Sequence, residues 1–305
     1  MKQDMNLIKL MEEFGSSEDA CREHLAQLRW PNGVKCPRCK TDKITPYAKR
    51  DQYDCRECDY RFSVTSGTIF ADSHLPLWKW FVATYLICES KKGMSANQLK
   101  RTLAVTYKTA WYLCHRIRTA MAEADTEPLT GLVEVDETYV GGKTRGKGRG
   151  AWAGGNKSMV VGAVERGGRI RLRSFPEPQG DQRYVLSRFV RDVVSDNAEA
   201  IYTDEHPAYG DLQKGKRKHH QIMHRQEEWV NGHIHTQTIE SAWSLFDRAV
   251  IGAYHKLSKK HLDAYLSEFE FRFNNRENPY LFRDTMMRLV QADPLTYKKL
   301  VKQAA

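Results

Sequence analysis

Residues 132–140 read LVEVDETYV, a run in which apolar and acidic side chains alternate. In an extended strand successive side chains point to opposite faces, so Val133 and Val135 lie on one face and Glu134 and Asp136 on the other. Carboxylates inside a sheet are costly unless a cation compensates them, which makes a bound metal a natural explanation. An exposed edge strand, which tolerates charge, is the alternative. The run therefore predicts a strand of a sheet that carries acidic side chains on one face.

Four more strand patterns and two helical ones follow this run. The strand patterns lie at residues 159–165, 169–175, 201–204 and 220–224. Gly167 and Gly168 separate the first two, which is typical of a hairpin. Apolar residues at helical spacing occupy residues 184–194, and a long helical region starts near Thr238. Strands and helices in this order favour an α/β domain in which helices cover a mixed sheet.

Two acidic residues outside the first strand can join Asp136 at one site. Asp204 ends the third of these strand patterns, and its carboxylate meets that of Asp136 if the two strands are neighbours. Glu240 lies at the start of the long helical region. Three carboxylates from separate elements can hold two Mg²⁺ or Mn²⁺ ions roughly 3.5–4 Å apart, an arrangement that supports phosphoryl transfer. Taken singly, none of the three acids is distinctive.

Four of the cysteines form two close pairs, Cys36-Pro-Arg-Cys39 and Cys55-Arg-Glu-Cys58. This spacing is typical of a structural zinc site with four thiolate ligands. The segment around them has too few apolar side chains to bury a core, so the metal would supply folding free energy. Two redox motifs are the alternative, but such a motif is usually single and lies beside a βαβ unit, which this region lacks. The pattern leaves open whether the ribbon contacts DNA or a protein.

Helical patterns lie on both sides of the cysteine segment. Residues 1–30 carry two apolar stripes, and Ser17 followed by two acidic residues is typical of a helix start. Residues 95–103 and 107–118 predict two helices joined by a short turn, as in a helix-turn-helix. The basic side chains expected to reach DNA are Lys100, Arg101, Lys108, Arg116 and Arg118. An ordinary helical hairpin with a solvated basic face is the alternative.

The charge of the chain favours a polyanionic partner. The 305 residues carry a formal net charge of +10, and residues 91–118 contain no acidic side chain. Neutralising phosphates releases condensed counterions, so clustered Lys and Arg favour nucleic acid. The longest apolar stretch, residues 78–88, is too short to span a bilayer. The N-terminal residues lack the apolar run of a secretory signal, so the expected location is the cytoplasm, in association with DNA.

Several motifs taken together resemble a known family over nearly the whole chain. Besides the two cysteine pairs they are FGSSEDAC (14–21), LRWPNG (28–33), FSVTSGTIF (62–70), EVDETYVGG (134–142), GAYHKLSKKHL (252–262) and EFEFRFNNR (268–276). The chain resembles bacterial insertion-sequence transposases of the zinc-ribbon, DDE class. The resemblance implies a ribonuclease H-like catalytic domain, recognition of terminal inverted repeats, and metal-dependent cleavage and joining of DNA. It assigns catalytic roles to Asp136 and Asp204, and to a third residue in the Thr-x-Thr-Ile-Glu segment, here Glu240.

The chain departs from the family pattern at two places. Family members often have Asn where Gln237 stands, and a Lys two helical turns after the Glu, where this chain has Asp247. Arg248 or Lys256 is then expected to hold the DNA phosphate instead. These departures keep two alternatives open: a zinc-ribbon and helix-turn-helix DNA-binding regulator with an inactive nuclease domain, and a plain nuclease of the same fold.

The sequence thus predicts a multidomain α+β protein. The expected domains are N-terminal helices (1–33), a zinc ribbon (34–70), a helical helix-turn-helix-like DNA-binding region (71–127), a ribonuclease H-like catalytic domain with a mixed sheet (128–280) and a C-terminal helical tail (281–305). The expected cofactors are structural Zn²⁺ and catalytic Mg²⁺ or Mn²⁺. The expected partner is double-stranded DNA, both terminal inverted repeats and target, with no membrane. Because pairing two DNA ends usually needs at least two subunits, a homodimer or higher oligomer is expected.

Overall fold

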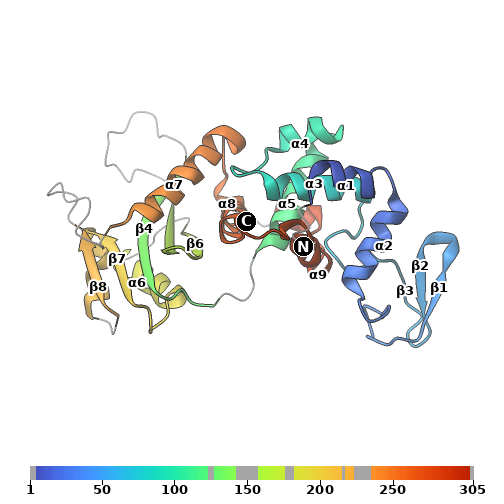
Figure 1. Ribbon diagram of the computed structural model, residues 1–305, viewed down its shortest axis with the longest axis horizontal. Helices are drawn as coiled ribbons and strands as arrows, with labels where there is room; N and C mark the ends of the chain where they lie inside the picture. The colour runs from blue at the N-terminus through green and yellow to red at the C-terminus, as the bar shows by residue number, and fades with distance from the viewer. Residues whose placement is uncertain are drawn as a thin grey trace. The chain divides into compact units, whose positions relative to one another are not determined.

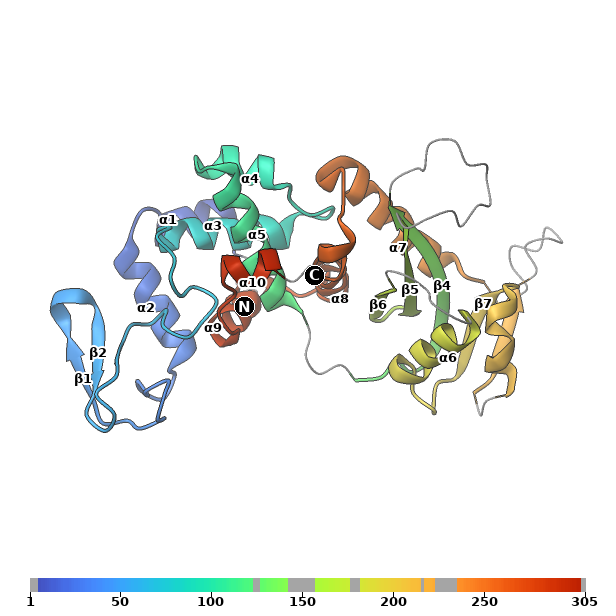
Figure 2. The same cartoon turned by 180° about the vertical axis from the view of Figure 1, so that it is seen from behind.

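The computed structural model describes residues 5–122, 127–141, 157–175, 182–214, 217–222 and 235–302. The chain divides into two compact units (Figures 1 and 2). Unit 1 combines Met1–Ala122 with Glu277–Ala305, and unit 2 comprises Glu123–Arg276. The residues expected to form a separate C-terminal tail therefore group with the N-terminal unit. Every helix in the described ranges is too short or too polar to cross a membrane.

A five-stranded mixed sheet forms the centre of unit 2 (Figure 2). Its strands are β4 (Leu132–Gly141), β5 (Lys157–Glu165), β6 (Ile170–Phe175), β7 (Ala200–Asp204) and β8 (His219–Ile222). Their order across the sheet is β6-β5-β4-β7-β8. The hairpin strands β4, β5 and β6 pair antiparallel, whereas β7 pairs parallel to β4 and β8 parallel to β7. The prediction of an α/β domain with a mixed sheet is confirmed.

Helices cover both faces of this sheet. They are α6 (Gln182–Val193), α7 (Gln237–Ala249) and α8 (Leu262–Asn274), accompanied by the short turns η2 (Pro207–Lys214), η4 (Val250–Tyr254) and η5 (Lys259–His261). One core lies between the sheet and α6, and it takes Val161 of β5. A second core lies between the sheet and α7 and α8, and it takes Val160 of the same strand. Because it is covered on both faces, β5 is a nearly continuous apolar run.

Seven helices are described in unit 1. They are α1 (Leu7–Phe14), α2 (Glu18–Arg29), α3 (Leu77–Glu89), α4 (Ala96–Leu103), α5 (Tyr107–Met121), α9 (Leu281–Gln291) and α10 (Tyr297–Lys302). Ser17 caps α2 as expected, because its hydroxyl accepts a hydrogen bond from the N–H of Ala20. α9 packs against α2, α3 and α5, and Thr285 of α9 lies 3.3 Å from the thiol of Cys88. The C-terminal segment is therefore part of the core of unit 1.

The cysteine segment forms a small antiparallel sheet within unit 1. Its strands β1 (Ile44–Tyr47), β2 (Gln52–Cys55) and β3 (Arg61–Phe62) lie in the order β1-β2-β3, with η1 (Ala48–Arg50) between the first two. The buried residues of its cluster are Cys36, Cys55 and Phe62. Two of these three side chains are thiols, so the apolar core is very small, as the composition of the segment predicted.

The turn between α4 and α5 contains an alanine in a left-handed conformation. Ala104 has φ 50° and ψ 56°, and its N–H bonds the carbonyl oxygens that end α4. This conformation is costly for a residue with a Cβ and is usually taken by glycine. We expect Ala104→Gly to raise the free energy of unfolding of unit 1 by about 0.5 kcal/mol, measured by urea denaturation. Ala120→Gly, inside α5, should have the opposite sign. Destabilisation by both substitutions would contradict the prediction.

Candidate functional site

Asp136 and Asp204 lie side by side at the middle of the sheet of unit 2. The parallel register places Glu134 of β4 beside Tyr202 of β7, and the two aspartates follow two residues further along each strand. Both side chains therefore lie on the face of the sheet that also carries Glu134. The two strands are neighbours, which is the condition on which the meeting of these carboxylates depended.

The surroundings of Asp136 concentrate negative charge. Burial, together with the charges of Glu137 and Asp204, raises the pKa of its carboxyl to about 7. Burial is also the main cause that raises the pKa of Glu137, with Asp204 contributing again. The charged groups that shift Asp136 are thus both acidic. Such a group of carboxylates is stabilised by a cation, and oxygen donors suit Mg²⁺ or Mn²⁺.

Glu240 lies in the first turn of α7, the helix that covers this face, but its side chain is exposed, unlike that of Asp136. It accepts a hydrogen bond of 2.8 Å from the hydroxyl of Thr236. Within the described residues, the cysteine cluster is the group of three or more ligand side chains whose donor atoms all lie within 4.8 Å. The oxygens of Asp136, Asp204 and Glu240 are therefore more widely spread than that. A single cation is not shared by all three in this arrangement, whereas two cations roughly 3.5–4 Å apart require a wider spread of ligands.

Glu134 is compensated by protein groups, which corrects the metal explanation for this residue. It is fully buried, and the guanidinium Nε of Arg166 lies 2.6 Å from its Oε1. Its Oε2 accepts hydrogen bonds of 2.7 Å and 3.0 Å from the N–H groups of Thr238 and Ile239. Those N–H groups belong to the first turn of α7 and have no partner within the helix. Glu134 thus caps α7 and fixes its start against the sheet.

Replacing Glu134 with glutamine should therefore destabilise unit 2. The side-chain amide introduced by Glu134→Gln would place a donor against donors and remove the buried negative charge beside Arg166, at a cost of about 3 kcal/mol. Urea unfolding measures the change. Glu127→Gln is the matched control, because its ion pair with Arg169 is 3.5 Å long and its side chain is 87% exposed. An equal change in the free energy of unfolding for the two variants would show that the buried Glu134–Arg166 pair contributes no more to stability than an exposed pair.

A hydrogen bond ties the segment after Asp204 to β4. The hydroxyl of Tyr209, which is fully buried in η2, donates to Glu137 Oε2 at 2.5 Å. The carboxylate of Asp204 accepts a hydrogen bond of 2.9 Å from the N–H of His206. Sequence reasoning missed Glu137 and Tyr209. The alternation of β4 carried a signal for Glu137, because this acidic residue lies on the strand face that Val133 and Val135 occupy.

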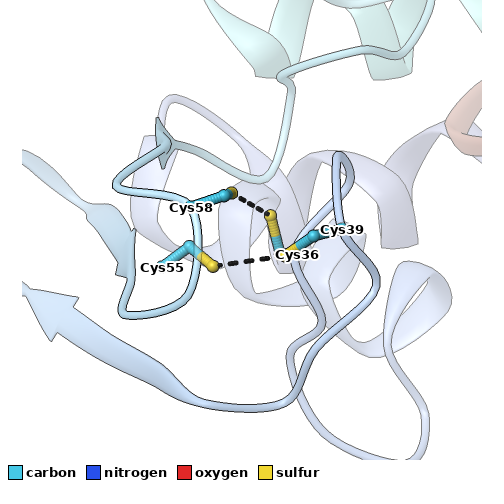
Figure 3. A group of neighbouring side chains, drawn as sticks. All are labelled: Cys36, Cys39, Cys55 and Cys58. Atoms are coloured by element: carbon cyan, nitrogen blue, oxygen red, sulfur yellow. Dashed lines mark hydrogen bonds between the residues drawn. The ribbon is translucent and has the colours of Figure 1, made fainter.

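The four paired cysteines converge in unit 1 (Figure 3). The Sγ atoms of Cys36 and Cys58 are 3.7 Å apart, and those of Cys39 and Cys55 are 3.4 Å apart. Each pair forms the same turn: the residue after the second cysteine has a positive φ, and its N–H bonds the carbonyl oxygen of the first. The edges of a ZnS₄ tetrahedron with Zn–S bonds of about 2.3 Å are about 3.8 Å long. The geometry of the thiols therefore fits one zinc ion.

The pKa values of these thiols differ in the absence of a cation. Although burial raises it, hydrogen bonds from the backbone lower the pKa of Cys36 to about 6. Burial raises the pKa of Cys58 to about 12, with further contributions from its hydrogen bonds to the other thiols. A bound metal ion deprotonates coordinating thiols, so it would remove this difference.

The basic residues expected to contact DNA fall into two groups. Lys100, Arg101 and Lys108 are exposed around the turn between α4 and α5, and Arg248 and Lys256 are exposed in unit 2. Arg116 and Arg118 are only 3% and 2% exposed. The guanidinium of Arg116 donates to the carbonyl oxygens of Ile69 and Ala71. The expectation that Arg116 and Arg118 face DNA is corrected, because buried guanidinium groups do not reach a phosphate.

Two family models match separate parts of the chain. Residues 128–274 match the ISXO2-like transposase domain, which covers the sheet and all three acidic residues. Residues 16–61 match the transposase zinc-ribbon domain, which covers the four cysteines.

A curated relative extends the similarity to most of the chain. An uncharacterized protein in transposable element ISH50 of Halobacterium salinarum is 31% identical over 277 residues, which is 84% of this chain and 90% of the relative. The chain therefore belongs to the transposase family that has an ISXO2-like transposase domain and a transposase zinc ribbon. The relative comes from an archaeon, so it does not confirm the expectation of a bacterial element.

Solved structures show only a distant likeness. The Mos1 strand transfer complex aligns over 69% of this chain and 75% of its own, with 11% identity and a TM-score of 0.29. A pre-cleavage Mos1 transpososome aligns over 67% and 76%, with 13% identity and a TM-score of 0.26. No function follows from similarities this low.

Proposed function

We propose that this transposase cleaves and joins DNA at the ends of an insertion sequence. Residues 128–280 form a ribonuclease H-like catalytic domain, and the site residues are Asp136, Asp204 and Glu240. The observation that carries the proposal is the pair of aspartates on neighbouring parallel strands, where burial and two acidic neighbours raise the pKa of Asp136. This excess of negative charge suits one or two divalent cations.

The reaction consists of two phosphoryl transfers at one site. Water attacks the phosphodiester at the end of the element, and the bond to the 3′ oxygen breaks to leave a 3′-hydroxyl. That hydroxyl then attacks a target phosphodiester, so that one P–O bond forms and one breaks. Mg²⁺ or Mn²⁺, when bound, activates the attacking oxygen and stabilises the leaving one. The two aspartates and Glu240 hold the cations, and no covalent protein–DNA intermediate is formed.

The four cysteines hold one structural Zn²⁺ ion. With four thiolate ligands no coordination position stays open for water, so the ion has no part in the chemistry. It stabilises the ribbon, residues 34–70, whose own apolar core is very small. The sulfur–sulfur distances of 3.4 Å and 3.7 Å support this assignment.

Unit 1 binds the terminal inverted repeats of double-stranded DNA. α4 and α5 are the helix-turn-helix of the region 71–127, and Lys100, Arg101 and Lys108 contact the phosphate backbone. Arg248 or Lys256 of unit 2 holds the phosphate near the reacting bond. Two DNA ends are brought together by at least two copies of the chain, as a homodimer or higher oligomer, on DNA in the cytoplasm.

A reaction with a defined DNA substrate tests the proposal. The purified chain is incubated with Mg²⁺ or Mn²⁺ and a duplex that carries the inverted repeats of its own element, together with a target plasmid. Strand-transfer products are expected. Cleavage without joining would indicate a plain nuclease, and binding without cleavage would indicate a DNA-binding regulator with an inactive nuclease domain.

A further inference from the structure

A tryptophan of α7 contacts the carboxylate of Asp136 directly. Trp243 lies three residues after Glu240, and its indole Nε1 donates a hydrogen bond of 3.0 Å to Asp136 Oδ2. Its side chain belongs to the core between the sheet and α7 and α8 and is 7% exposed. Sequence analysis assigned Trp243 no role at the site, because an aromatic residue at helical spacing is usually only part of a core.

The strand beside Asp136 makes room for this indole. Gly162 of β5 is the direct partner of Asp136 in the antiparallel register. A Cβ at Gly162 would lie 2.7 Å from two ring carbons of Trp243, closer than real Cβ atoms approach, and 3.0 Å from Ile239 Cδ1. Its φ is not in the left-handed region, so the need for glycine here is one of space. The absence of a side chain at Gly162 therefore leaves the space that the indole of Trp243 occupies beside Asp136.

The hydrogen bond has a defined effect on the carboxylate. An N–H donor to a carboxylate oxygen fixes the rotation of the group and occupies one of its acceptor positions. The carboxylate also accepts a hydrogen bond from the backbone N–H of Glu137, and its remaining acceptor positions are available to a cation. The bond also connects β4 to α7, whose first turn contains Glu240, about one turn before Trp243. One side chain thus orients the first acidic residue and ties it to the helix of the third.

We propose that Trp243 is a positioning residue that sets the divalent-cation affinity of the site by orienting Asp136, and that Gly162 provides the space for it. This inference rests on the proposed function, because it assigns the cation to Asp136. The class of ligand is a hard divalent cation, Mg²⁺ or Mn²⁺, bound through carboxylate oxygens.

Mn²⁺ binding to the zinc-loaded, full-length chain tests the inference without any need for catalysis. The Kd for Mn²⁺ is measured by electron paramagnetic resonance for the wild type and for Trp243→Phe, which removes the N–H donor. A partner of a metal ligand typically contributes about 10-fold or more to affinity, so the Kd should rise about 10-fold. The Mn²⁺ concentration for half-maximal cleavage should rise by the same factor, and DNA affinity should not change.

A second variant separates the hydrogen bond from packing. Phenylalanine leaves a void, whereas 3-benzothienylalanine at position 243 keeps the bicyclic shape and lacks the N–H. It should lose the same Mn²⁺ affinity as Trp243→Phe while the Tm stays close to that of the wild type. Trp80→Phe is the matched control, because Trp80 Nε1 also donates a hydrogen bond of 3.0 Å, to Ser73 in unit 1. Its Mn²⁺ affinity should be that of the wild type.

The role of Gly162 is tested by combining substitutions. Gly162→Ala should displace the indole and weaken Mn²⁺ binding although Trp243 is present. Both changes remove the same hydrogen bond, that between Trp243 and Asp136. The double variant Gly162→Ala with Trp243→Phe should therefore bind Mn²⁺ no more weakly than Trp243→Phe alone. Multiplicative losses would show that Gly162 acts independently, which would overturn its part of the inference.

The failure of this inference differs from the failure of the proposed function. If the wild type binds Mn²⁺ and cleaves DNA while Trp243→Phe and the benzothienyl variant retain its affinity within about twofold, the positioning role is wrong and the function stands. If the wild type neither binds Mn²⁺ through Asp136, as judged by Asp136→Asn, nor cleaves DNA, the proposed function itself is wrong.

Discussion

Asp136→Asn is expected to abolish DNA cleavage and strand transfer while leaving the fold intact. Loss of a cation ligand at the reacting phosphate removes several kcal/mol of transition-state stabilisation, which corresponds to a rate at least about 10³-fold lower. Stability should not fall, because the neutral amide no longer places a buried charge beside Glu137 and Asp204. Single-turnover cleavage of an inverted-repeat duplex measures the first effect, and the Tm of the metal-free chain measures the second.

A matched acidic residue of the same unit provides the control. Asp192 forms an exposed ion pair of 2.7 Å with Arg173, and Asp192→Asn should keep both the cleavage rate and the DNA affinity of the wild type. Cleavage by Asp136→Asn at the rate of this control would overturn the assignment of Asp136. A large fall in its Tm would instead assign the residue a structural role.

Removal of the zinc ion should unfold the ribbon but leave unit 2 folded. Cys36→Ser, or a chelator, removes a contribution of roughly 10 kcal/mol or more from a segment whose core contains one fully buried apolar side chain other than cysteine, that of Phe62. Unit 2 has two large cores that contain no cysteine, so its unfolding transition should not shift. Zinc content and limited proteolysis, with cleavage sites mapped to residues 34–70, measure the outcome.

Another buried cysteine distinguishes loss of metal from loss of a thiol. Cys21 is fully buried in α2 and lies outside the cluster of four. Cys21→Ser should lower stability modestly while one zinc ion per chain is retained. A ribbon that resists protease after chelation would show that the metal does not stabilise it.

The sequence predicted those parts of the fold whose determinants are local. The two cysteine pairs define the ribbon because each turn is only a few residues long. The alternation in residues 132–140 predicted which face of β4 carries Asp136, and the strand pattern of residues 201–204 predicted a strand that ends in Asp204. Which residues of a strand share one face, and which residue ends the strand, both depend on a short stretch of sequence. They are therefore visible without tertiary information.

The predictions that were corrected depend on distant segments. Periodicity placed Arg116 and Arg118 on the exposed face of α5. However, α5 packs against α3, α4 and α9, so more than one of its faces is buried. α9 follows α5 by more than 150 residues in the chain. Glu134 suggested a metal because its real partner, Arg166, lies beyond the next strand. The space at Gly162 has meaning only once α7 crosses β5. Such pairings are set by how elements pack and leave no local pattern.

The composition of unit 1 from both ends of the chain has a consequence for biosynthesis. Its core needs α9, and translation reaches residues 281–291 only after all of unit 2 has been made. α5 therefore acquires its full packing last, although it is synthesised early. A product that ends within unit 2 has a unit 1 that lacks α9. Under the proposed function, such shortened products are expected to lose DNA binding as well as catalysis.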